Sequence, residues 1–289
     1  MKKKGISVVL ATYNEEKNIN DCLTSVKDIA DEIIVIDGSS KDKTVEIAKS
    51  FGARVYFLNN PKMFHINKQF ALEKAKHDWI LQLDADEKLT KSLAGEIKKI
   101  SKMGRKELEE YQEKVMEIKL FKRHQKLIEK RDGKVGMDDG EYAGFFVPRR
   151  NYFLGKYLRY GGTYPDGVIR LVKNGKASFP CKSVHEQIEI DGRVGWLENG
   201  LLHKDSPTFK RYLEKNSKYI NLIVDEFGKK NLKINLFTFI KYMLVKPTSW
   251  FFMTTIRHKG ILDGWQGIVF SFFSALRFPR AYLRYIIKK

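Results

Sequence analysis

Short apolar runs alternate with amphipathic segments along the first 90 residues of the chain. Four runs are suited to buried strands, at residues 6–10, 32–36, 55–58 and 79–83. Between them, residues 18–27 place apolar side chains at helical spacing, a second segment from residue 42 closes at Gly52, and residues 66–76 precede the last run. Strands that alternate with helices in this way predict an α/β fold with a mostly parallel, doubly wound sheet.

Polar residues follow three of these strands immediately. The first strand runs into Ala11, Thr12, Tyr13 and Glu15, the second into Asp37 and a Gly/Ser turn, and the fourth into Asp84, Ala85 and Asp86. Open α/β sheets bind their ligands beyond the carboxyl ends of the strands. We therefore expect these residues to share one ligand-binding edge of the sheet.

The pair Asp84 and Asp86 carries the strongest indication of chemistry. The two residues are separated by one position, so in an extended backbone both side chains point to the same side. Two hard oxygen ligands at a strand end can hold Mg²⁺ or Mn²⁺ and leave positions open for the phosphates of a ligand. An isolated Asp-x-Asp is most often a solvated turn, but here it follows the buried run 79–83.

Three motifs in this order resemble a known family. They are Ala11-Thr12-Tyr13-Asn14-Glu15, the segment from Asp37 to Thr44, and Asp84-Ala85-Asp86-Glu87. Residues 5–90 resemble the nucleotide-sugar half of a family 2 glycosyltransferase with the Rossmann-like GT-A fold. The resemblance implies a nucleotide pocket formed by Ala11, Thr12, Tyr13, Glu15 and Asp37, and a diphosphate contact at Lys68. It also implies that the nucleotide sugar binds through Asp84, Ala85 and a metal ion on Asp86. Gln69 departs from the Asn that is common in relatives.

The second half of the chain resembles the acceptor half of bacterial enzymes that build cell-surface glycans, including lipopolysaccharide-core glucosyltransferases. The matching residues are Gly161 to Asp166, Arg170-Leu171 and Val184-His185-Glu186. Glu186 is implied as the general base, a role that typically contributes about 10²–10⁴-fold, with Asp166 as the second candidate. Arg170 would neutralise the diphosphate and His203 would be a third metal ligand. Alternatively, Glu186 is a surface glutamate, Arg170 pairs with a local acid, and His203 is a packed core histidine.

Length and composition limit the class of protein. A chain of 289 residues can bury one substantial core with an appended region. It has no apolar run of 18 residues, no signal-peptide pattern, and only Cys22 and Cys181 as cysteines. These features predict a cytoplasmic protein without a disulfide framework or a structural zinc site.

The net charge of +19 calls for an acidic partner, and the charge is concentrated near the end of the chain. Residues 227–289 hold twelve Lys or Arg residues, one acid (Asp263) and fourteen of the 36 aromatic residues. No nucleic-acid module signature is present, so we expect no nucleic-acid partner. Residues 236–245, 250–256 and 268–287 read as amphipathic helices interrupted by Pro247 and Pro279. They suit peripheral contact with the anionic inner face of the cell membrane, or else a contact between copies in a homo-oligomer.

The predicted organisation is a GT-A catalytic domain over residues 1–205 and a helical, membrane-associating or oligomerising region over residues 206–289. The catalytic domain has a nucleotide-sugar half at 1–90, a charged, solvated helical insertion at about 92–135 and an acceptor half at about 140–205.

The resulting hypothesis is an inverting glycosyltransferase that uses Mg²⁺ or Mn²⁺. Its donor would be a nucleotide-diphosphate sugar such as a UDP-sugar, and its acceptor a hydroxyl of a glycan or lipid-linked precursor. Two alternatives stay open. A polyprenyl-phosphate glycosyltransferase would need no glutamate base, because its acceptor is already ionised. A non-enzymatic module that binds membrane or nucleic acid would not turn over a nucleotide sugar.

Overall fold

The computed structural model describes residues 3–61, 63–181 and 187–289. The chain divides into two compact units. Unit 1 comprises Met1–Arg149 and Pro165–His203, and unit 2 comprises Arg150–Tyr164 and Lys204–Lys289. The predicted α/β class is confirmed in unit 1.

The nucleotide-sugar half of the chain forms the parallel part of a mixed sheet. Its strands lie in the order β3-β2-β1-β4, and every neighbouring pair is parallel. Their bounds are β1 Lys3–Thr12, β2 Glu32–Asp37, β3 Arg54–Phe57 and β4 His77–Leu83. The apolar runs in the sequence therefore predicted the strands correctly, and residues 12, 37 and 84 lie together at the carboxyl edge of this sheet.

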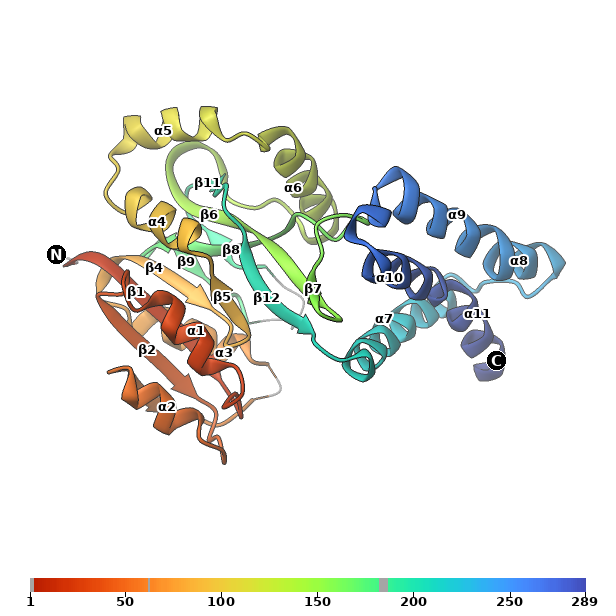
Figure 1. Cartoon of the computed structure of the whole chain (residues 1–289), viewed down its shortest axis with the longest axis horizontal. Helices are drawn as coiled ribbons and strands as arrows, with labels where there is room; N and C mark the ends of the chain where they lie inside the picture. Colours follow the sequence, from red (N-terminus) through yellow and green to blue (C-terminus); the bar gives the residue numbers. More distant parts are fainter. Residues whose placement is uncertain (1–2, 62, 182–186) are drawn as a thin grey trace. The chain divides into compact units, whose positions relative to one another are not determined.

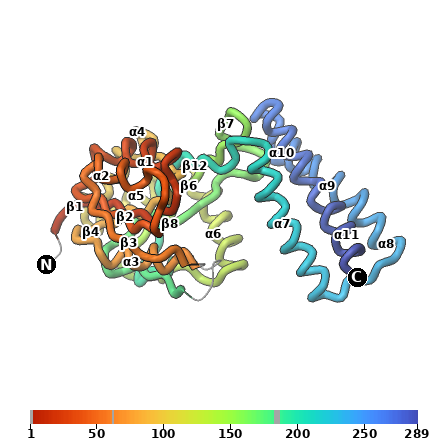
Figure 2. Tube along the Cα trace, turned by 90° about the horizontal axis from the view of Figure 1, so that it is seen from below, coloured from red at the N-terminus to blue at the C-terminus, as the bar shows by residue number. Residues whose placement is uncertain are grey.

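Helices cover both faces of the parallel strands, as Figure 2 shows. Helices α1 (Ile19–Val26), α2 (Thr44–Ser50) and α4 (Lys91–Ile100) lie on one face, and α3 (His65–Lys74) lies on the other. Side chains of a strand alternate between its faces, so Val8 and Leu10 pack in the cluster that contains Cys22 of α1, while α3 contacts β1 and β2 from behind. Gly52 ends α2 as predicted, with φ +74° and an N–H bond to Lys49 O of 2.9 Å.

The sheet continues beyond β4 with antiparallel strands, in the order β8-β6-β12-β5. These are β5 Glu87–Leu89, β6 Met137–Phe153, β8 Asp166–Lys173 and β12 Leu201–Ser206, and β11 (Arg193–Trp196) pairs with β6 in parallel. The remaining strands are short: β7 Lys156–Tyr157, β9 Ala177–Ser178 and β10 Glu189–Ile190. This half joins the parallel strands through the pairing of β8 with β4, and β5 pairs with the start of β12 (Figure 1).

The charged segment 92–135 is helical, as expected, but it is not wholly solvated. It contains three helices, α4, α5 (Arg105–Lys114) and α6 (Ile118–Asp132). Phe121 of α6 is fully buried and stacks on Trp196 of β11 at 4.7 Å between ring centroids. The sequence did not predict this packing, because only one narrow apolar stripe of each helix faces the rest of unit 1 and the apolar residues are therefore thinly spaced.

Unit 2 is mainly helical. It contains α7 (Phe209–Lys229), a continuous helical run over residues 236–257, α10 (Trp265–Ala275) and α11 (Arg277–Lys288). The run comprises α8 Leu236–Ile240, the π-helical η1 Lys241–Val245, α9 Lys246–Phe252 and the π-helical η2 Met253–Arg257; a 3₁₀ turn, η3 Gly260–Asp263, follows. Ile220, Phe227 and Tyr282 are buried in its core.

The expected proline break is wrong at Pro247. Pro247 lies inside the continuous run, directly after the π turn of η1, which accommodates the missing N–H bond without ending the helix. Pro279 lies in the first turn of α11, where backbone N–H groups have no partner within the helix in any case. The segment 268–287 divides at Leu276, close to Pro279, in agreement with the break expected at this proline. Within the described parts of the chain, we find no helix with the length and apolar character needed to span a bilayer.

Candidate functional site

Asp37 closes β2 and holds the first loops of the site together. Its Oδ2 accepts from Thr12 Oγ1 at 3.0 Å and from Ser40 Oγ at 2.6 Å, and its Oδ1 accepts from the Ser40 backbone N at 2.7 Å. Asp37 is fully buried, Thr12 is buried, Ala11 is half-buried and Tyr13 is exposed. The predicted nucleotide residues thus surround the carboxyl ends of β1 and β2, and Asp37 fixes their loops.

The loops after β1 and β2 are hydrogen-bonded to each other through Asn14, for which the sequence predicted no role. Asn14 N donates to Ser40 Oγ and Asn14 Oδ1 accepts from Lys41 N, both at 2.8 Å. Glu15 N donates to Thr44 Oγ1 at 2.7 Å. Asn14 has φ +55°, a left-handed conformation that Asn adopts more readily than most residues. The Tyr-Asn-Glu sequence after an apolar strand was the available signal.

Asp84 lies at the end of β4 between two cations. Its Oδ1 is 2.5 Å from Lys68 Nζ of α3, and its Oδ2 accepts from an Arg170 NH2 of β8 at 2.5 Å. Arg170 also donates to Gln82 Oε1 at 2.5 Å. The side chains of Lys68 and Arg170 are 11% and 7% exposed, whereas that of Asp84 is 32% exposed. Three predicted residues therefore meet at one point, with Asp84 facing outward.

The charges in this cluster reinforce one another. Burial works to raise the pKa of Asp84, but the positive charges of Arg170 and Lys68 hold that pKa well below its usual value. Burial likewise works to lower the pKa of Arg170, and the carboxylates of Asp84 and Glu87 raise it above its usual value. Asp84 and Arg170 are consequently both charged at neutral pH.

Glu87 joins this cluster to a second arginine, and neither residue was identified from the sequence. The Glu87 side chain is completely buried; its Oε1 accepts from Arg170 at 2.7 Å and from Arg149 at 3.3 Å. Glu87 Oε2 accepts from Asp84 N at 3.0 Å. Arg149 in turn donates to Asp166 Oδ2 at 2.7 Å. Glu87 therefore positions both arginines and the Asp84 backbone, and its place in the Asp-Ala-Asp-Glu motif was the available signal.

Asp86 and His203 form a separate pair beside Asp84. His203 Nε2 is 3.5 Å from Asp86 Oδ2, because His203 of β12 is paired with residue 87 of β5. Over the residues that the structure describes, no three His, Cys, Asp or Glu side chains gather closely enough to hold a metal ion. The set Asp84, Asp86 and His203 thus stays a prediction. Ala85 packs its side chain into the core.

The Asp86–His203 pair has a donor set that fits a divalent ion. A carboxylate oxygen and an imidazole nitrogen are both ligands that Mn²⁺ accepts, and the carboxylate also suits Mg²⁺. The Nε atoms of Arg149 and Arg170 are buried and bond to no acceptor among the described residues. The edge thus combines ligands for a cation with donors for an anion, as a metal–diphosphate group requires.

The two base candidates differ in what can be said of them. Glu186, with the neighbouring His185, lies outside the described residues. Asp166 begins β8 and bonds to Arg149, and its side chain is 37% exposed. The next residue, Gly167, donates its N–H to His124 Nε2 at 3.1 Å. Burial lowers the pKa of His124, so this ring is the neutral acceptor that the bond requires.

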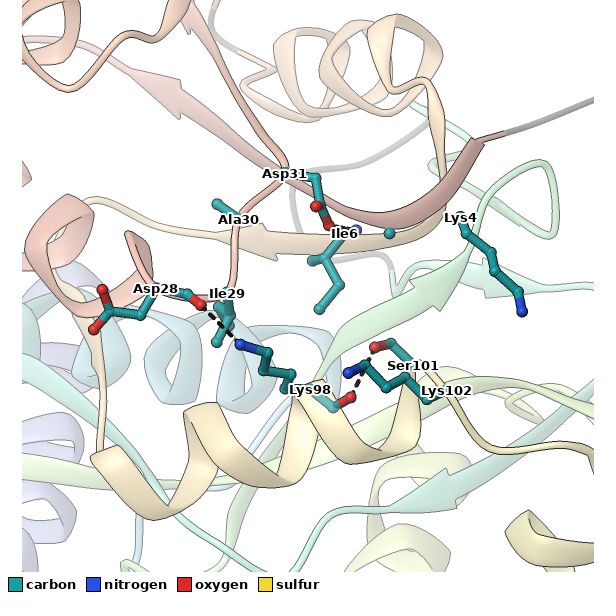
Figure 3. A pocket seen from close by; sticks show the side chains of 10 residues that line it. Lys4, Ile6, Asp28, Ile29, Ala30, Asp31, Lys98, Ser101 and Lys102 are labelled. Atoms are coloured by element: carbon teal, nitrogen blue, oxygen red, sulfur yellow. Dashed lines mark hydrogen bonds between the residues drawn. The ribbon is translucent and has the colours of Figure 1, made fainter.

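A pocket of about 360 Å³ lies at the opposite end of β1, as Figure 3 shows. Lys4, Asp31 and Lys102 are among its lining residues, and Lys98 Nζ donates to Asp28 O at 3.4 Å. These residues surround the amino end of β1, whereas Thr12 marks its carboxyl end. Open α/β folds bind ligands at the carboxyl ends of their strands, so this pocket is not part of the candidate site.

The sequence of this chain matches the model of glycosyl transferase family 2 over residues 7–132. An uncharacterised glycosyltransferase of Rickettsia bellii is 48% identical over 98 residues, which are 34% of this chain and 33% of that protein. The chain therefore spans about a third of the length of that relative. The lipopolysaccharide core biosynthesis glycosyltransferase LpsC of Rhizobium meliloti is 27% identical over 99% of this chain and 95% of its own length.

Among solved structures, glucosyl-3-phosphoglycerate synthase of Mycobacterium tuberculosis, in complex with Mn²⁺, UDP and glucosyl-3-phosphoglycerate, is 29% identical. The match covers 29% of this chain and 34% of that chain, with a TM-score of 0.26.

Proposed function

We propose that the chain is a family 2 glycosyltransferase, whose family model its residues 7–132 match, and that it transfers a sugar, with inversion, from a nucleotide diphosphate to an acceptor hydroxyl. The observation that carries this proposal is the cluster at the carboxyl edge of the sheet. There, Asp84 and Asp86 adjoin Lys68, Arg170 and His203, so ligands for a divalent cation lie next to donors for phosphate oxygens.

The nucleoside would bind over the ends of β1 and β2. Tyr13 offers an exposed ring for the base, and Thr12 and Asp37 hold the loop that carries it. Glu15 is fixed through its backbone N–H to Thr44. Asp37 Oδ1 and Oδ2 already accept from Ser40 and Thr12, so binding of the base to Asp37 would use remaining lone pairs on those oxygens.

The diphosphate would bind between β4 and β8. Asp86 and His203 would hold Mg²⁺ or Mn²⁺, which stabilises the charge that builds on the leaving diphosphate. Lys68 and Arg170 would contact phosphate oxygens from the protein side, where both are held in place by Asp84. Because these cations are largely buried, their interaction with a bound phosphate is weakly screened by solvent.

The acceptor side requires a base that removes the hydroxyl proton as the oxygen attacks the anomeric carbon. Glu186 is our candidate for this base. Asp166 is the second candidate, and its carboxylate accepts a hydrogen bond from Arg149. The acceptor would be a glycan or lipid-linked precursor at the cytoplasmic membrane face, where the basic residues of unit 2 would favour binding to anionic lipid.

A thermal-shift screen tests the donor site directly. Nucleotide diphosphates and nucleotide-diphosphate sugars would be added with Mn²⁺, with Mg²⁺ and with EDTA, since a ligand that binds the native state raises its apparent stability. A shift for one nucleotide class that depends on metal supports the proposal. A chain that responds to no member of the panel, with or without metal, would refute it.

A further inference from the structure

The turn between η2 and α10, residues 256–265, carries an unusual group of exposed apolar side chains. Ile256 is 64% exposed, Ile261 56%, Leu262 57% and Trp265 58%. Single exposed apolar residues are common on proteins, but four within ten residues form a patch, and such patches mark contact surfaces.

The turn is held in shape by close backbone packing within unit 2. Lys259 has φ +57°, and Gly161 N donates to His258 O at 2.9 Å. A Cβ on Gly260 would lie 2.7 Å from Thr254 O, so a larger residue does not fit there. Asp263 is buried and accepts from the backbone N–H groups of residues 159 and 160 at 3.0 and 2.8 Å. The patch is therefore displayed by a fixed scaffold, and its exposure does not come from a frayed end.

The exposed charged side chains within this turn have a single sign. Arg257, His258 and Lys259 are exposed in the same turn. Every residue of 227–289 is described, and Asp263 is the one acidic side chain in that range, against twelve Lys or Arg residues. Because Asp263 is turned inward, this segment presents no acidic side chain to solvent.

This combination selects one class of partner. Exposed aliphatic side chains beside cations fit the interface of an anionic bilayer, and Trp is enriched at the level of the lipid headgroups. A symmetric dimer would place the same surface opposite itself, so Arg257 and Lys259 would face their own copies. Nucleic-acid phosphates would satisfy the cations but leave Ile261 and Leu262 without a partner.

We propose that the 256–265 turn inserts into the interfacial region of anionic membranes. Ile261 and Leu262 enter below the headgroups, Trp265 lies at the headgroup level, and Arg257 and Lys259 contact lipid phosphates. The purpose of this insertion rests on the proposed function, because a lipid-linked acceptor would be met at the membrane. Membrane binding itself does not require turnover.

Trp265 provides a spectroscopic test. The full chain would be mixed with vesicles of phosphatidylethanolamine and phosphatidylglycerol that contain brominated lipid, which quenches only nearby indoles. Trp79 and Trp196 are buried and Trp250 is half-buried, so Trp265 is the most exposed reporter. We expect a blue shift and quenching that disappear in Trp265→Phe, while that variant still sediments with the vesicles. Bound protein without any quenching of Trp265 would refute insertion of this turn.

A matched pair of variants tests the contribution of the apolar patch. Leu262→Asp and Ile287→Asp each remove an exposed aliphatic side chain and add one negative charge, and Ile287 lies outside the turn at 84% exposure. We expect Leu262→Asp to weaken vesicle binding by about tenfold or more, the amount that burial of one leucine side chain supports. Ile287→Asp should change it by less than about threefold, the effect of one charge near the surface being smaller when its side chain is not inserted.

Two further results decide between the possible explanations. Equal weakening by both variants would mean that general charge, and no inserted turn, binds the vesicles. Dissociation of a dimer by Leu262→Asp in the absence of vesicles would identify the turn as a self-association surface and overturn the proposal. Hydrolysis of the donor sugar, measured without vesicles, should be the same in wild type and Leu262→Asp. If the wild type shows no hydrolysis of any donor sugar, the proposed function is refuted, whereas the proposal that the turn inserts into membranes is unaffected.

Discussion

Asp84 shows why the most informative motif of the sequence did not fully describe its own site. The strand 79–83 correctly placed both aspartates at the ligand edge. The sequence indicated that Arg170 could pair with a local acid and that Asp86 and His203 could share a metal, but it did not indicate that the acid is Asp84 or that Lys68 binds Asp84 as well. The side chains come from α3, β8 and β12, and contacts between residues so far apart in the sequence are set by the tertiary fold.

The first prediction concerns the metal. Asp86→Asn keeps the size of the side chain but weakens its ligand oxygen. We expect metal-dependent nucleotide binding to weaken by more than the 10–100-fold that is typical for the loss of an outer-shell partner. Isothermal titration with UDP and Mn²⁺ measures this. Asp138→Asn, which changes an exposed aspartate of β6, is the control and should bind as the wild type does. Unchanged affinity in Asp86→Asn would remove Asp86 from the metal site.

The second prediction concerns the base. Glu186→Gln removes a proton acceptor and preserves shape. We expect kcat to fall by about two to four orders of magnitude, the usual contribution of a general base, with donor affinity nearly unchanged. Steady-state kinetics together with donor titration separates the two effects. Full activity in Glu186→Gln would favour the polyprenyl-phosphate alternative, in which the acceptor needs no base.

The third prediction concerns Glu87. Its carboxylate is the shared buried partner of Arg149 and Arg170, so Glu87→Ala would leave two buried guanidinium groups without it. Removing one partner of a buried ion pair typically costs about 3–5 kcal/mol of the free energy of unfolding, which urea denaturation would measure. Glu110→Ala removes an exposed i, i+4 pair with Lys114 and should change stability by less than about 1 kcal/mol. Similar losses in both variants would show that Glu87 has no special structural role.

At the scale of secondary-structure elements, prediction succeeded where burial pattern was decisive. The runs at 32–36 and 79–83 became β2 and β4 because each is buried on both faces of the sheet, which demands continuous apolar residues. The insertion was harder: Phe121 gains its burial from Trp196, 75 positions further along the chain, and no local pattern reveals that contact. Pro247 misled for a related reason, because a π turn compensates for its missing N–H.

The fourth prediction concerns the amino end of β2. Burial works to raise the pKa of Glu32, but bonds from Ser7 Oγ and Lys76 N, with the charge of Arg54, lower it below its usual value. A carboxyl group with a lowered folded-state pKa contributes stability above its unfolded pKa, and this contribution is lost as the pH falls through the folded pKa. We expect Glu32→Gln to be less stable than wild type near pH 7, and the difference should shrink below about pH 4. Denaturation across this pH range tests it; a constant difference would contradict it.

At the scale of the whole molecule, the sequence predicted a sheet domain and a basic helical region, and the family resemblance supplied the chemistry. Composition alone would have allowed a nucleic-acid or a membrane partner, since +19 attracts either. The structure adds that the exposed residues of 256–265 are apolar as well as basic, a combination that charge counts cannot indicate.

The fifth prediction follows from this combination. Binding of the full chain to anionic vesicles should weaken between 0.1 M and 1 M salt, because the screening length falls from about 10 Å to about 3 Å. It should not vanish, since burial of apolar area is not screened by salt. Vesicle sedimentation at both salt concentrations measures the electrostatic and the apolar contributions to binding. Complete release at high salt would mean that the contact is purely electrostatic.

The central claim is that the aspartate edge binds a metal and a nucleotide-diphosphate sugar for turnover. The most direct test is the release of nucleoside diphosphate from a panel of nucleotide-diphosphate sugars by metal-free protein, before and after addition of Mn²⁺ or Mg²⁺. We predict that one donor class is turned over only after the metal is restored, and that Asp86→Asn stays inactive under the same conditions. Undiminished turnover by metal-free protein, or wild-type turnover by Asp86→Asn, would contradict the account.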